Sequence, residues 1–368
     1  MLQRLRFHVE STRGRRYPEP EHSYRNAFHR DRDRIIHSRA FRRLEHKTQV
    51  FSPALSDHFR NRLTHTIEVS QIARTVAKVL GLNEDLTEAL ALVHDVGHPP
   101  FAHAGEEALN ALMHRYGERF EHNIQSLRAV DSIEHRYPRF PGLNLTFEVR
   151  EGIVKHSRDF GPGESPLLDQ YLPGLRPPLE AQLIDLADEV AYNTADIDDA
   201  YEAGLVKPEQ IAGEVPAYYE ILDAVETQFP GASERERFQE SIRQMVHDLV
   251  SGLIEGTVAA AAGAGVTSAE GVREYPERLA RFSSEALETS LQLKRSLQRY
   301  VYCSVSLVED RRDSIERLTR MFEYLMEHPE EATGLDPTRQ PRHRAVCDFI
   351  AGMTDRYFFR VYDSLFPA

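Results

Sequence analysis

The stretch of sequence that decides the fold and the chemistry of this chain lies at residues 94–106. It reads His94-Asp95-Val96-Gly97-His98-Pro99-Pro100-Phe101-Ala102-His103-Ala104-Gly105-Glu106. An apolar helical run, Leu86 to Val93, leads into it, and Gly97 and two prolines then break the helix. The pattern therefore predicts one helix that ends in a histidine and an aspartate. A second helix would carry His103 and Glu106 on one face, because these residues are three positions apart.

Two distant residues complete a candidate metal site. His65 lies on an upstream amphipathic stretch and Asp188 on a downstream one. Alone, a neighbouring histidine and aspartate would indicate no more than a capped or solvated helix end. Neutral imidazole and carboxylate are, however, the usual protein ligands for divalent cations. We therefore expect His65, His94, Asp95 and Asp188, which lie on three separate helices, to bind one metal ion.

Further motifs resemble those of the deoxyguanosine triphosphate triphosphohydrolase-like family of HD-domain phosphohydrolases. They occur in order from about residue 25 to about residue 358 and so cover nearly the whole chain. Besides residues 94–106, the matching segments are Ser38-Arg39-Ala40-Phe41-Arg42-Arg43-Leu44, Lys47-Thr48-Gln49-Val50-Phe51, Arg62-Leu63-Thr64-His65-Thr66, Glu121-His122-Asn123, Asp188-Glu189-Val190-Ala191-Tyr192 and Gly352-Met353-Thr354-Asp355-Arg356-Tyr357.

The resemblance implies a fold, a reaction and a set of substrate contacts. The fold would be all-α, an HD-domain helical core with additional C-terminal helices. The reaction would convert a deoxynucleoside triphosphate, dGTP or several dNTPs, to the deoxynucleoside and inorganic triphosphate. By the same resemblance, Gln49 would contact the deoxyribose 3′-hydroxyl and His122 the triphosphate. Tyr192 and Asp196 would contact phosphate and the sugar hydroxyl.

Two further residues are expected to hold the triphosphate. Arg62 lies three residues before His65 and so shares its helix face, where its planar guanidinium suits phosphate oxygens. His98 is assigned to the same role, although it stands where many family members carry another polar residue, often asparagine.

Expulsion of the 5′-alkoxide needs a proton, and His103 is the candidate general acid. Glu106 would orient or charge its imidazole. The reverse assignment, in which this pair activates the attacking water, stays open. Open, oxygen-rich coordination with two histidines suits Mn²⁺ or Mg²⁺, with Fe²⁺ or Co²⁺ as further candidates.

Composition limits the partners. The formal net charge of -13 argues against a dedicated nucleic-acid-binding protein, because such a chain repels polyanions on average. Basic residues nevertheless crowd the first fifty positions, interleaved with Asp31, Asp33 and Glu45. They predict either a solvated, partly ion-paired arm or positive potential for a triphosphate, and single-stranded DNA stays an open candidate.

No run of about 20 apolar residues occurs, so no membrane span is expected. The N-terminal residues lack the apolar core of a signal peptide. Without an export signal, Cys303 and Cys347 are expected to be buried thiols rather than a disulfide, and the expected location is the cytoplasm.

The periodicity predicts helices with a few specific breaks. Residues 1–24 are expected to form a loosely held arm, residues 52–58 a loop, and residues 258–266 an Ala/Gly-rich connection. A single last helix is expected from about 344 to 362. The expected division is an N-terminal basic, substrate-contacting segment at 1–57, an HD-domain core at 58–205 and a C-terminal helical region at 206–368.

Two other functions fit parts of this pattern. One is an HD-domain phosphohydrolase that acts on a nucleoside monophosphate or a cyclic dinucleotide. The other is a non-enzymatic module that binds nucleotides or single-stranded DNA. The family resemblance further implies a homo-oligomer, often a hexamer, and an allosteric dNTP site at a subunit interface.

Overall fold

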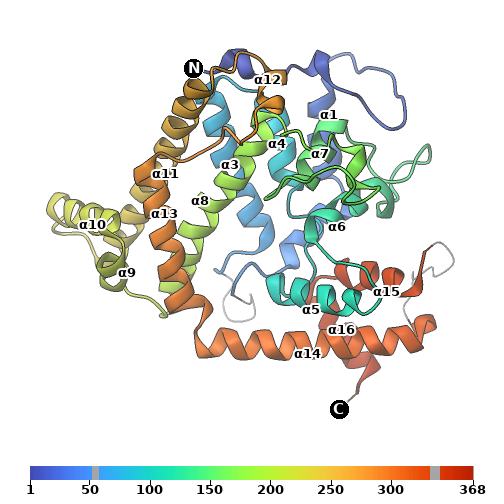
Figure 1. The fold of residues 1–368 in the computed structure, drawn as a ribbon. Coiled ribbons are helices and arrows are strands. Elements are labelled where there is room, and N and C mark those ends of the chain that lie inside the picture. The colour runs from blue at the N-terminus through green and yellow to red at the C-terminus, as the bar shows by residue number, and fades with distance from the viewer. Residues whose placement is uncertain (52–57, 332–339, 368) are drawn as a thin grey trace. The chain divides into compact units, whose positions relative to one another are not determined.

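A computed structural model describes residues 1–51, 58–331 and 340–367 of the chain. The described residues form helices joined by loops, with isolated β-bridges and no strand (Figure 1). The expected all-α fold is confirmed. The loop expected at residues 52–58 lies almost entirely outside the described residues. Among the described helices, none combines the length and the apolar character that crossing a membrane requires.

The chain divides into two compact units, which are described separately. Unit 1 comprises residues 1–13, 67–91 and 155–305, and unit 2 comprises residues 14–66, 92–154 and 306–368. Helices α3 (Arg62–Leu80), α4 (Glu84–Val93) and α14 (Val305–Glu327) include residues of both units. The domain boundaries expected at residues 57 and 205 stay predictions.

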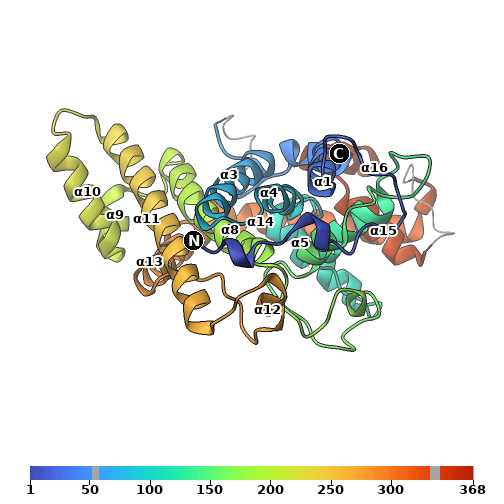
Figure 2. The same cartoon turned by 90° about the horizontal axis from the view of Figure 1, so that it is seen from above.

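Unit 1 is organised around α8 (Leu179–Glu202), which runs beside α11 (Glu234–Ala264) and α13 (Ser284–Leu297) (Figures 1 and 2). Close packing is visible in the stacked rings of Tyr201 and Phe238, whose centroids are 4.0 Å apart. Asn193 Nδ2 donates to Ser290 Oγ at 2.8 Å and so fixes α8 against α13. The remaining helices of this unit are α9 (Pro208–Glu214), α10 (Pro216–Gln228) and α12 (Ala269–Glu274).

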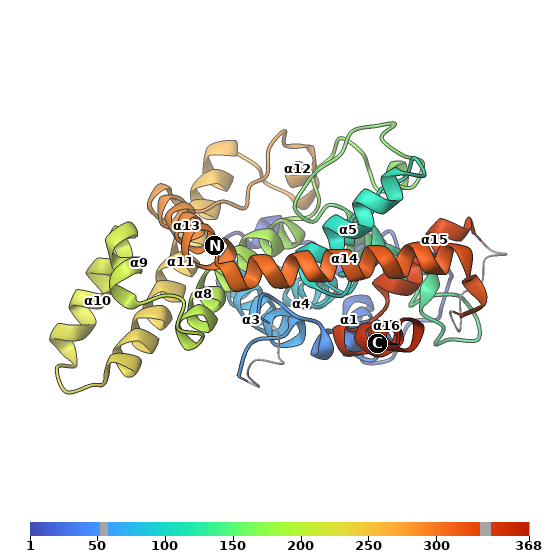
Figure 3. The ribbon, with the colours of Figure 1, turned by 90° about the horizontal axis from the view of Figure 1, so that it is seen from below.

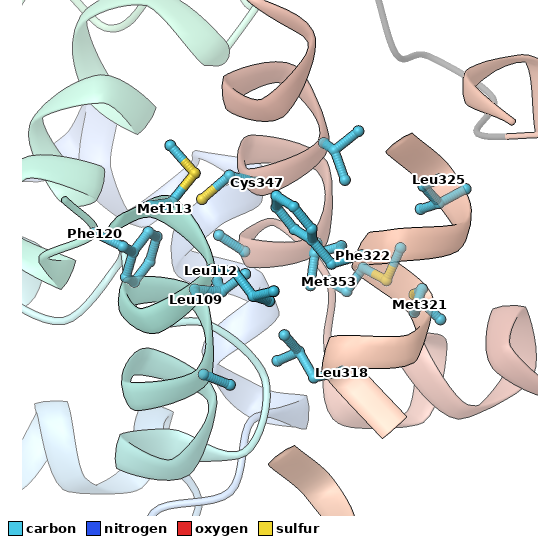
Figure 4. Packing of buried hydrophobic residues seen from close by; sticks show 14 of the residues in the cluster. Leu109, Leu112, Met113, Phe120, Leu318, Met321, Phe322, Leu325, Cys347 and Met353 are labelled. Carbon is cyan, nitrogen blue, oxygen red and sulfur yellow. The ribbon is translucent and has the colours of Figure 1, made fainter. Parts of the chain in front are cut away.

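One hydrophobic cluster of unit 2 joins residues from the middle of the chain to residues near its end. Figure 3 shows the ribbons of α5 (Ala102–His114), α14, α15 (Arg342–Ala351) and α16 (Asp355–Leu365). Buried side chains of these helices form one cluster (Figure 4). Leu109, Phe322 and Cys347 are fully buried in it. The other helices are α1 (Ala27–Ile36), α2 (Arg39–Arg43), α6 (His122–Arg128) and α7 (Phe147–Val154).

Local sequence signals set several helix ends. Ser233 Oγ accepts from the amide of Glu236, whose carboxylate accepts from the amide of Ser233, and this capping box starts α11. Gly265 ends α11 with a positive φ of 65°. Thr354 Oγ1 accepts from the amide of Tyr357 and caps α16.

Four expectations about secondary structure and burial were wrong. Residues 258–266 are not a connection, because α11 continues through residues 258–264 to its glycine cap. The last helix is two helices, since the chain leaves the helical conformation between α15 and α16, where Thr354 caps the second. The N-terminal arm is held in place by buried Leu2, Leu5 and Phe7. Both cysteines are free, but Cys303 is exposed.

Many of the N-terminal arginines form ion pairs within unit 2. Arg15 pairs with buried Asp31, and Arg25 with Asp33 at 2.8 Å. Glu19 accepts from Arg34 at 2.8 Å. The acidic residues interleaved in this part of the sequence therefore neutralise much of its positive charge.

Candidate active site

The turn that follows α4 is held by backbone hydrogen bonds and by one side chain of α6. The amide of His98 donates to the carbonyl of Asp95 at 3.1 Å. Ser126 Oγ accepts from the amide of Gly97 at 2.9 Å and donates to the carbonyl of His94 at 3.1 Å. A Cβ atom at residue 97 would lie 2.1 Å from the amide nitrogen of Ser126. Glycine is therefore required for the turn to pack this closely against α6.

A second tight segment begins α5. Phe101 and Ala102 have φ values of 66° and 52°, a left-handed conformation that costs free energy for residues other than glycine. Gly105 lies against Pro100, whose carbonyl oxygen would be 1.9 Å from a Cβ atom at residue 105. This packing places His103 in the first turn of α5, directly after the turn that carries His94 to His98.

His65, His94 and Asp95 form a buried cluster that suits a divalent metal. Each offers one ligand atom, and these atoms all lie within 4.8 Å of one another. His65 lies in the first turn of α3, whereas His94 and Asp95 lie in the turn that directly follows α4. Two imidazoles and a carboxylate from separate elements are a donor set that borderline divalent cations prefer. The residues therefore fit the metal that the sequence predicts.

Asp95 is also the centre of an electrostatic network. Arg62 Nη1 donates to Asp95 Oδ2 at 2.6 Å, and His98 Nε2 lies 3.0 Å from Asp95 Oδ1. Burial by itself would raise the pKa of Asp95, but His94, His98 and Arg62 outweigh that effect and hold the pKa well below its usual range. Asp95 is therefore ionised at neutral pH, the form in which a carboxylate can bind a metal ion.

His98 and His122 form a stacked pair beside this carboxylate. Their ring centroids are 3.9 Å apart and their planes differ by 13°. Burial lowers the pKa of His98 well below its ordinary value, and Arg62 and His122 add to the effect. Glu106 Oε1 accepts from the amide of His122 at 2.8 Å and lies 3.0 Å from its Nδ1. The pair thus presents one neutral imidazole and one imidazole oriented by a carboxylate.

His103 lies at the exposed side of the same cluster. Its ring centroid is 6.0 Å from that of His98. Partial desolvation, together with Arg62 and His122, lowers the pKa of His103, while the charge of Glu106 opposes the shift. Within the described part of the chain, the hydrogen bonds of the Glu106 carboxylate go to His122 rather than to His103. Glu106 therefore acts on His103 through its charge.

Gln49 lies between α2 and α3 in unit 2. Its amide oxygen Oε1 is buried and has no hydrogen-bond partner among residues 1–51, 58–331 and 340–367. A buried acceptor without a donor costs free energy, and a ligand hydroxyl is one group that can supply the donor.

Asp188, Tyr192 and Asp196 lie at every fourth position of α8, in unit 1, and so share one face of that helix. Burial raises the pKa of Tyr192, and Glu189, Asp188 and Asp196 add to the shift, so the phenol stays protonated. Tyr302 Oη donates a hydrogen bond to Asp196. The part of Asp188 in the metal site stays a prediction, as do the substrate contacts of Tyr192 and Asp196.

Sequence reasoning missed two residues that contact this face of α8. Lys294 Nζ lies 2.8 Å from Glu189 Oε2 and 5.8 Å from the centre of the Tyr192 ring. Tyr302, which follows α13, is the hydrogen-bond donor to Asp196. Both lie about 100 residues after α8 in the chain, and no motif marks them. Only the packing of α13 on α8 brings them to this face.

Comparison with known proteins matches two families to this chain. The HD domain family matches residues 62–193, the region from the start of α3 to the middle of α8. The phosphohydrolase-associated domain family matches residues 280–364, the region of α13 to α16.

Similar proteins extend over nearly the whole chain. A deoxyguanosinetriphosphate triphosphohydrolase-like protein of Geobacter sulfurreducens is 47% identical over 365 residues, which cover 96% of this chain and 92% of that protein. The protein of the same name from Ralstonia nicotianae is 47% identical and covers 98% of this chain and 93% of its own length. That of Azoarcus sp. (strain BH72) is 45% identical, with 96% and 94% covered. These matches confirm the resemblance read from the motifs: the chain belongs to the deoxyguanosinetriphosphate triphosphohydrolase-like family of HD-domain proteins.

Proposed function

We propose that this protein hydrolyses deoxynucleoside triphosphates, dGTP or several dNTPs, to the deoxynucleoside and inorganic triphosphate. The observation that carries the proposal is the buried cluster of His65, His94 and Asp95, with Arg62 bonded to its carboxylate. His98 and His122 adjoin that carboxylate. One set of residues can thus bind a cation and phosphate oxygens together.

The residues expected to hold the metal are His65, His94, Asp95 and Asp188. A divalent cation bound there would supply Lewis-acid polarisation of the α-phosphate and would lower the pKa of the attacking water. The low pKa of Asp95 keeps one ligand anionic over the physiological pH range. Arg62 keeps the carboxylate of Asp95 in a fixed orientation.

The substrate would be held through its phosphates and its sugar. Arg62 and His122 offer nitrogen donors to triphosphate oxygens. His98 Nε2 faces Asp95, so only an imidazolium form of His98 would donate to them, from Nδ1. Glu106 orients His122 by accepting from its backbone and its ring. Gln49 Oε1 would accept a hydrogen bond from the 3′-hydroxyl, which would satisfy a buried oxygen that has no donor among the described residues. A site that needs this hydroxyl discriminates strongly against an analogue that lacks it.

The bond that breaks joins the α-phosphorus to the 5′-oxygen. Water oxygen forms the new bond to phosphorus, and the 5′-oxygen leaves with a proton from His103. The water protons pass to solvent and restore the histidine. In the reverse role His103 accepts a proton from water, and the rate should then rise with pH instead of falling.

Several finer features belong to the proposal. The metal would be Mn²⁺ or Mg²⁺, with Fe²⁺ or Co²⁺ as alternatives. The protein would act in the cytoplasm as a homo-oligomer, such as a hexamer, and a second dNTP would activate it. Single-stranded DNA is the partner with least support, because the N-terminal arginines are extensively paired with carboxylates.

A product assay tests the proposal. The protein with added Mn²⁺ is incubated with each dNTP, singly and in mixtures, and the products are separated by anion exchange. Triphosphate and deoxynucleoside in equal amounts are expected, and they should be absent with the His94→Ala variant. Activity on mixtures above the sum of single substrates would indicate an activating nucleotide.

Other outcomes reject this reaction. Release of diphosphate or monophosphate, or turnover of a nucleoside monophosphate or a cyclic dinucleotide alone, would favour another HD-domain phosphohydrolase activity. DNA binding without turnover, retained in His94→Ala and weakened by salt, would favour a binding module.

A further inference from the structure

The end of α15 and the start of α16 contact the two parts of unit 2 that carry Gln49 and His103. Asp355, the first residue of α16, accepts two backbone hydrogen bonds from distant parts of the chain. Its Oδ2 accepts from the amide of Thr48 at 2.8 Å, and its Oδ1 accepts from the amide of Phe101 at 3.0 Å. One carboxylate thus joins the residue before Gln49 to the turn two residues before His103.

Lys47 makes a second connection between the same parts. Its side chain is fully buried, and Nζ donates to the carbonyl of His98 and, at 3.2 Å, to the carbonyl of Ala351 at the end of α15. The carbonyl of Lys47 accepts from the amide of Arg62 at 3.0 Å. Lys47 and Asp355 therefore connect the segments of Gln49, Arg62, His98 and His103 to one helix junction.

The turn at Phe101 needs such support. Phe101 and Ala102 are consecutive non-glycine residues in the left-handed region, which an isolated chain would leave. The ring of Phe101 packs on Phe358 and Phe359, with centroids 4.8 Å and 5.3 Å apart. Asp355 fixes the backbone of the same residue. α16 thus holds both the main chain and the side chain of the residue that precedes α5.

We propose that Asp355 and Lys47 are positioning residues. They would hold Gln49, which contacts the sugar, and His103, which donates the proton, in a fixed position relative to each other. The inference rests on the proposed function for the roles of Gln49 and His103. It gives the Gly352–Tyr357 motif a task in the reaction, although that motif lies about 250 residues after His103 in the chain.

The chemistry of Asp355 suggests a sharp test. Both of its oxygens accept from an N–H group, and an asparagine of the same shape offers only one acceptor oxygen. In Asp355→Asn the amide group must face one of the two N–H donors, so one connection is lost while volume is conserved. Asp31→Asn is the matched control. Asp31 is a fully buried carboxylate of the same unit that accepts from the amide of Thr146 at 2.9 Å.

The functional measurement compares a dNTP with its 2′,3′-dideoxy analogue. Sites built on a buried hydroxyl contact favour the hydroxylated substrate by about 10⁴-fold or more. In Asp355→Asn, kcat should fall and this preference in kcat/KM should shrink about tenfold or more, because Gln49 and His103 are no longer fixed together. Asp31→Asn should keep the wild-type preference even if its Tm falls.

A second measurement does not depend on activity. Hydrogen–deuterium exchange of the amides of Thr48 and Phe101 should be faster in Asp355→Asn for at least one of the two, and unchanged in Asp31→Asn. If Asp355→Asn does not fold, Asp355→Glu replaces it, because it keeps two acceptor oxygens but shifts them by one methylene. The preference of Asp355→Glu for a dNTP over its 2′,3′-dideoxy analogue should also shrink.

The two failures are distinguishable. A wild-type protein that does not release triphosphate overturns the proposed function, and the exchange experiment still tests whether Asp355 holds both segments. A variant at Asp355 with wild-type preference and wild-type exchange at Thr48 and Phe101 overturns the positioning role.

Discussion

The turn at residues 94–101 and the face of α8 at residues 188–196 present site residues in opposite ways. On α8 a regular helix of 24 residues repeats its functional positions every fourth residue. The turn has no repeating geometry and is held by Ser126, Lys47 and Asp355 from other parts of the chain. The helix face therefore depends mainly on local backbone structure, whereas the turn depends on contacts distant in sequence.

The largest effect should come from removing a metal ligand from either region. Asp95→Ala and Asp188→Ala should both lose the bound metal and abolish turnover. The fall in kcat should exceed the contribution of a general acid, which is about 10²–10⁴-fold. Metal content by atomic absorption and the dNTP product assay check both variants. Full metal occupancy in a folded Asp188→Ala protein would show that α8 does not bind the metal. The ligands would then be His65 and the two residues of the turn.

His103→Ala should reduce kcat by about 10²–10⁴-fold while dNTP binding and metal content stay close to wild type. The reason is that His103 would act on the leaving oxygen in the transition state and not on the ground-state phosphates. Binding is measured by calorimetry with a non-hydrolysable dNTP. Loss of binding in a folded, metal-loaded variant would instead make His103 a substrate-holding residue.

Glycine replacements compare the stability of the turn with that of a regular helix, α11, which lies outside the face of α8. Gly97→Ala should lower the free energy of unfolding by about 1–3 kcal/mol or more, because its Cβ atom would meet Ser126 and His122. Gly263 lies within α11, and a Cβ atom there would have no described residue within 4 Å apart from its own helix backbone and its chain neighbours. Gly263→Ala should therefore raise the free energy of unfolding by about 0.5–1 kcal/mol. Urea unfolding of both variants gives the comparison. Equal changes would mean that the turn relaxes without cost.

Two lysines, Lys47 beside the turn and Lys294 beside α8, can be compared by the stability that each loses when it is replaced by methionine. Lys47→Met would leave two buried carbonyl groups without their donor, at a cost of about 1–3 kcal/mol each. Lys294→Met removes a partly exposed ion pair worth about 0–1 kcal/mol. Urea unfolding at pH 7 should therefore show a much larger loss for Lys47→Met.

Lys47 should also affect how the free energy of unfolding changes with pH. Burial lowers the pKa of Lys47 from 10.5 to about 7, and Arg43 adds to the shift. Between these values the unfolded chain holds a proton that the folded protein lacks, so this group makes stability rise with pH. That contribution should be absent from Lys47→Met and retained in Lys294→Met. Parallel pH profiles for all three proteins would contradict the low pKa.

The smallest effect should be a shift of one limb of the pH–rate profile. If His103 is the general acid, kcat/KM falls as pH rises above its pKa, which lies below the ordinary value of 6.5. Glu106→Gln removes a charge that raises this pKa, so the falling limb should move to lower pH. A rate that rises with pH over the same range would assign His103 to activation of water.

Features that depend on short-range periodicity could be predicted from the sequence. The helix predicted to lead into His94 and Asp95 is α4, which ends at Val93, and the helix predicted to carry His103 and Glu106 is α5. The all-α fold and the membership of an HD-domain family were also predicted and are confirmed. The break between α15 and α16 was missed, because the capping role of Thr354 shows no apolar periodicity of its own.

The sequence by itself determined the family, the helical periodicity and the set of candidate ligands, because these depend on residue types and on spacings of three or four positions. Only the tertiary structure decided that Glu106 bonds His122, that Lys294 and Tyr302 meet α8, and that Asp355 joins Thr48 to Phe101. These contacts connect side chains whose separation in sequence carries no information about distance. They form only when the apolar surfaces of separate helices are buried against one another.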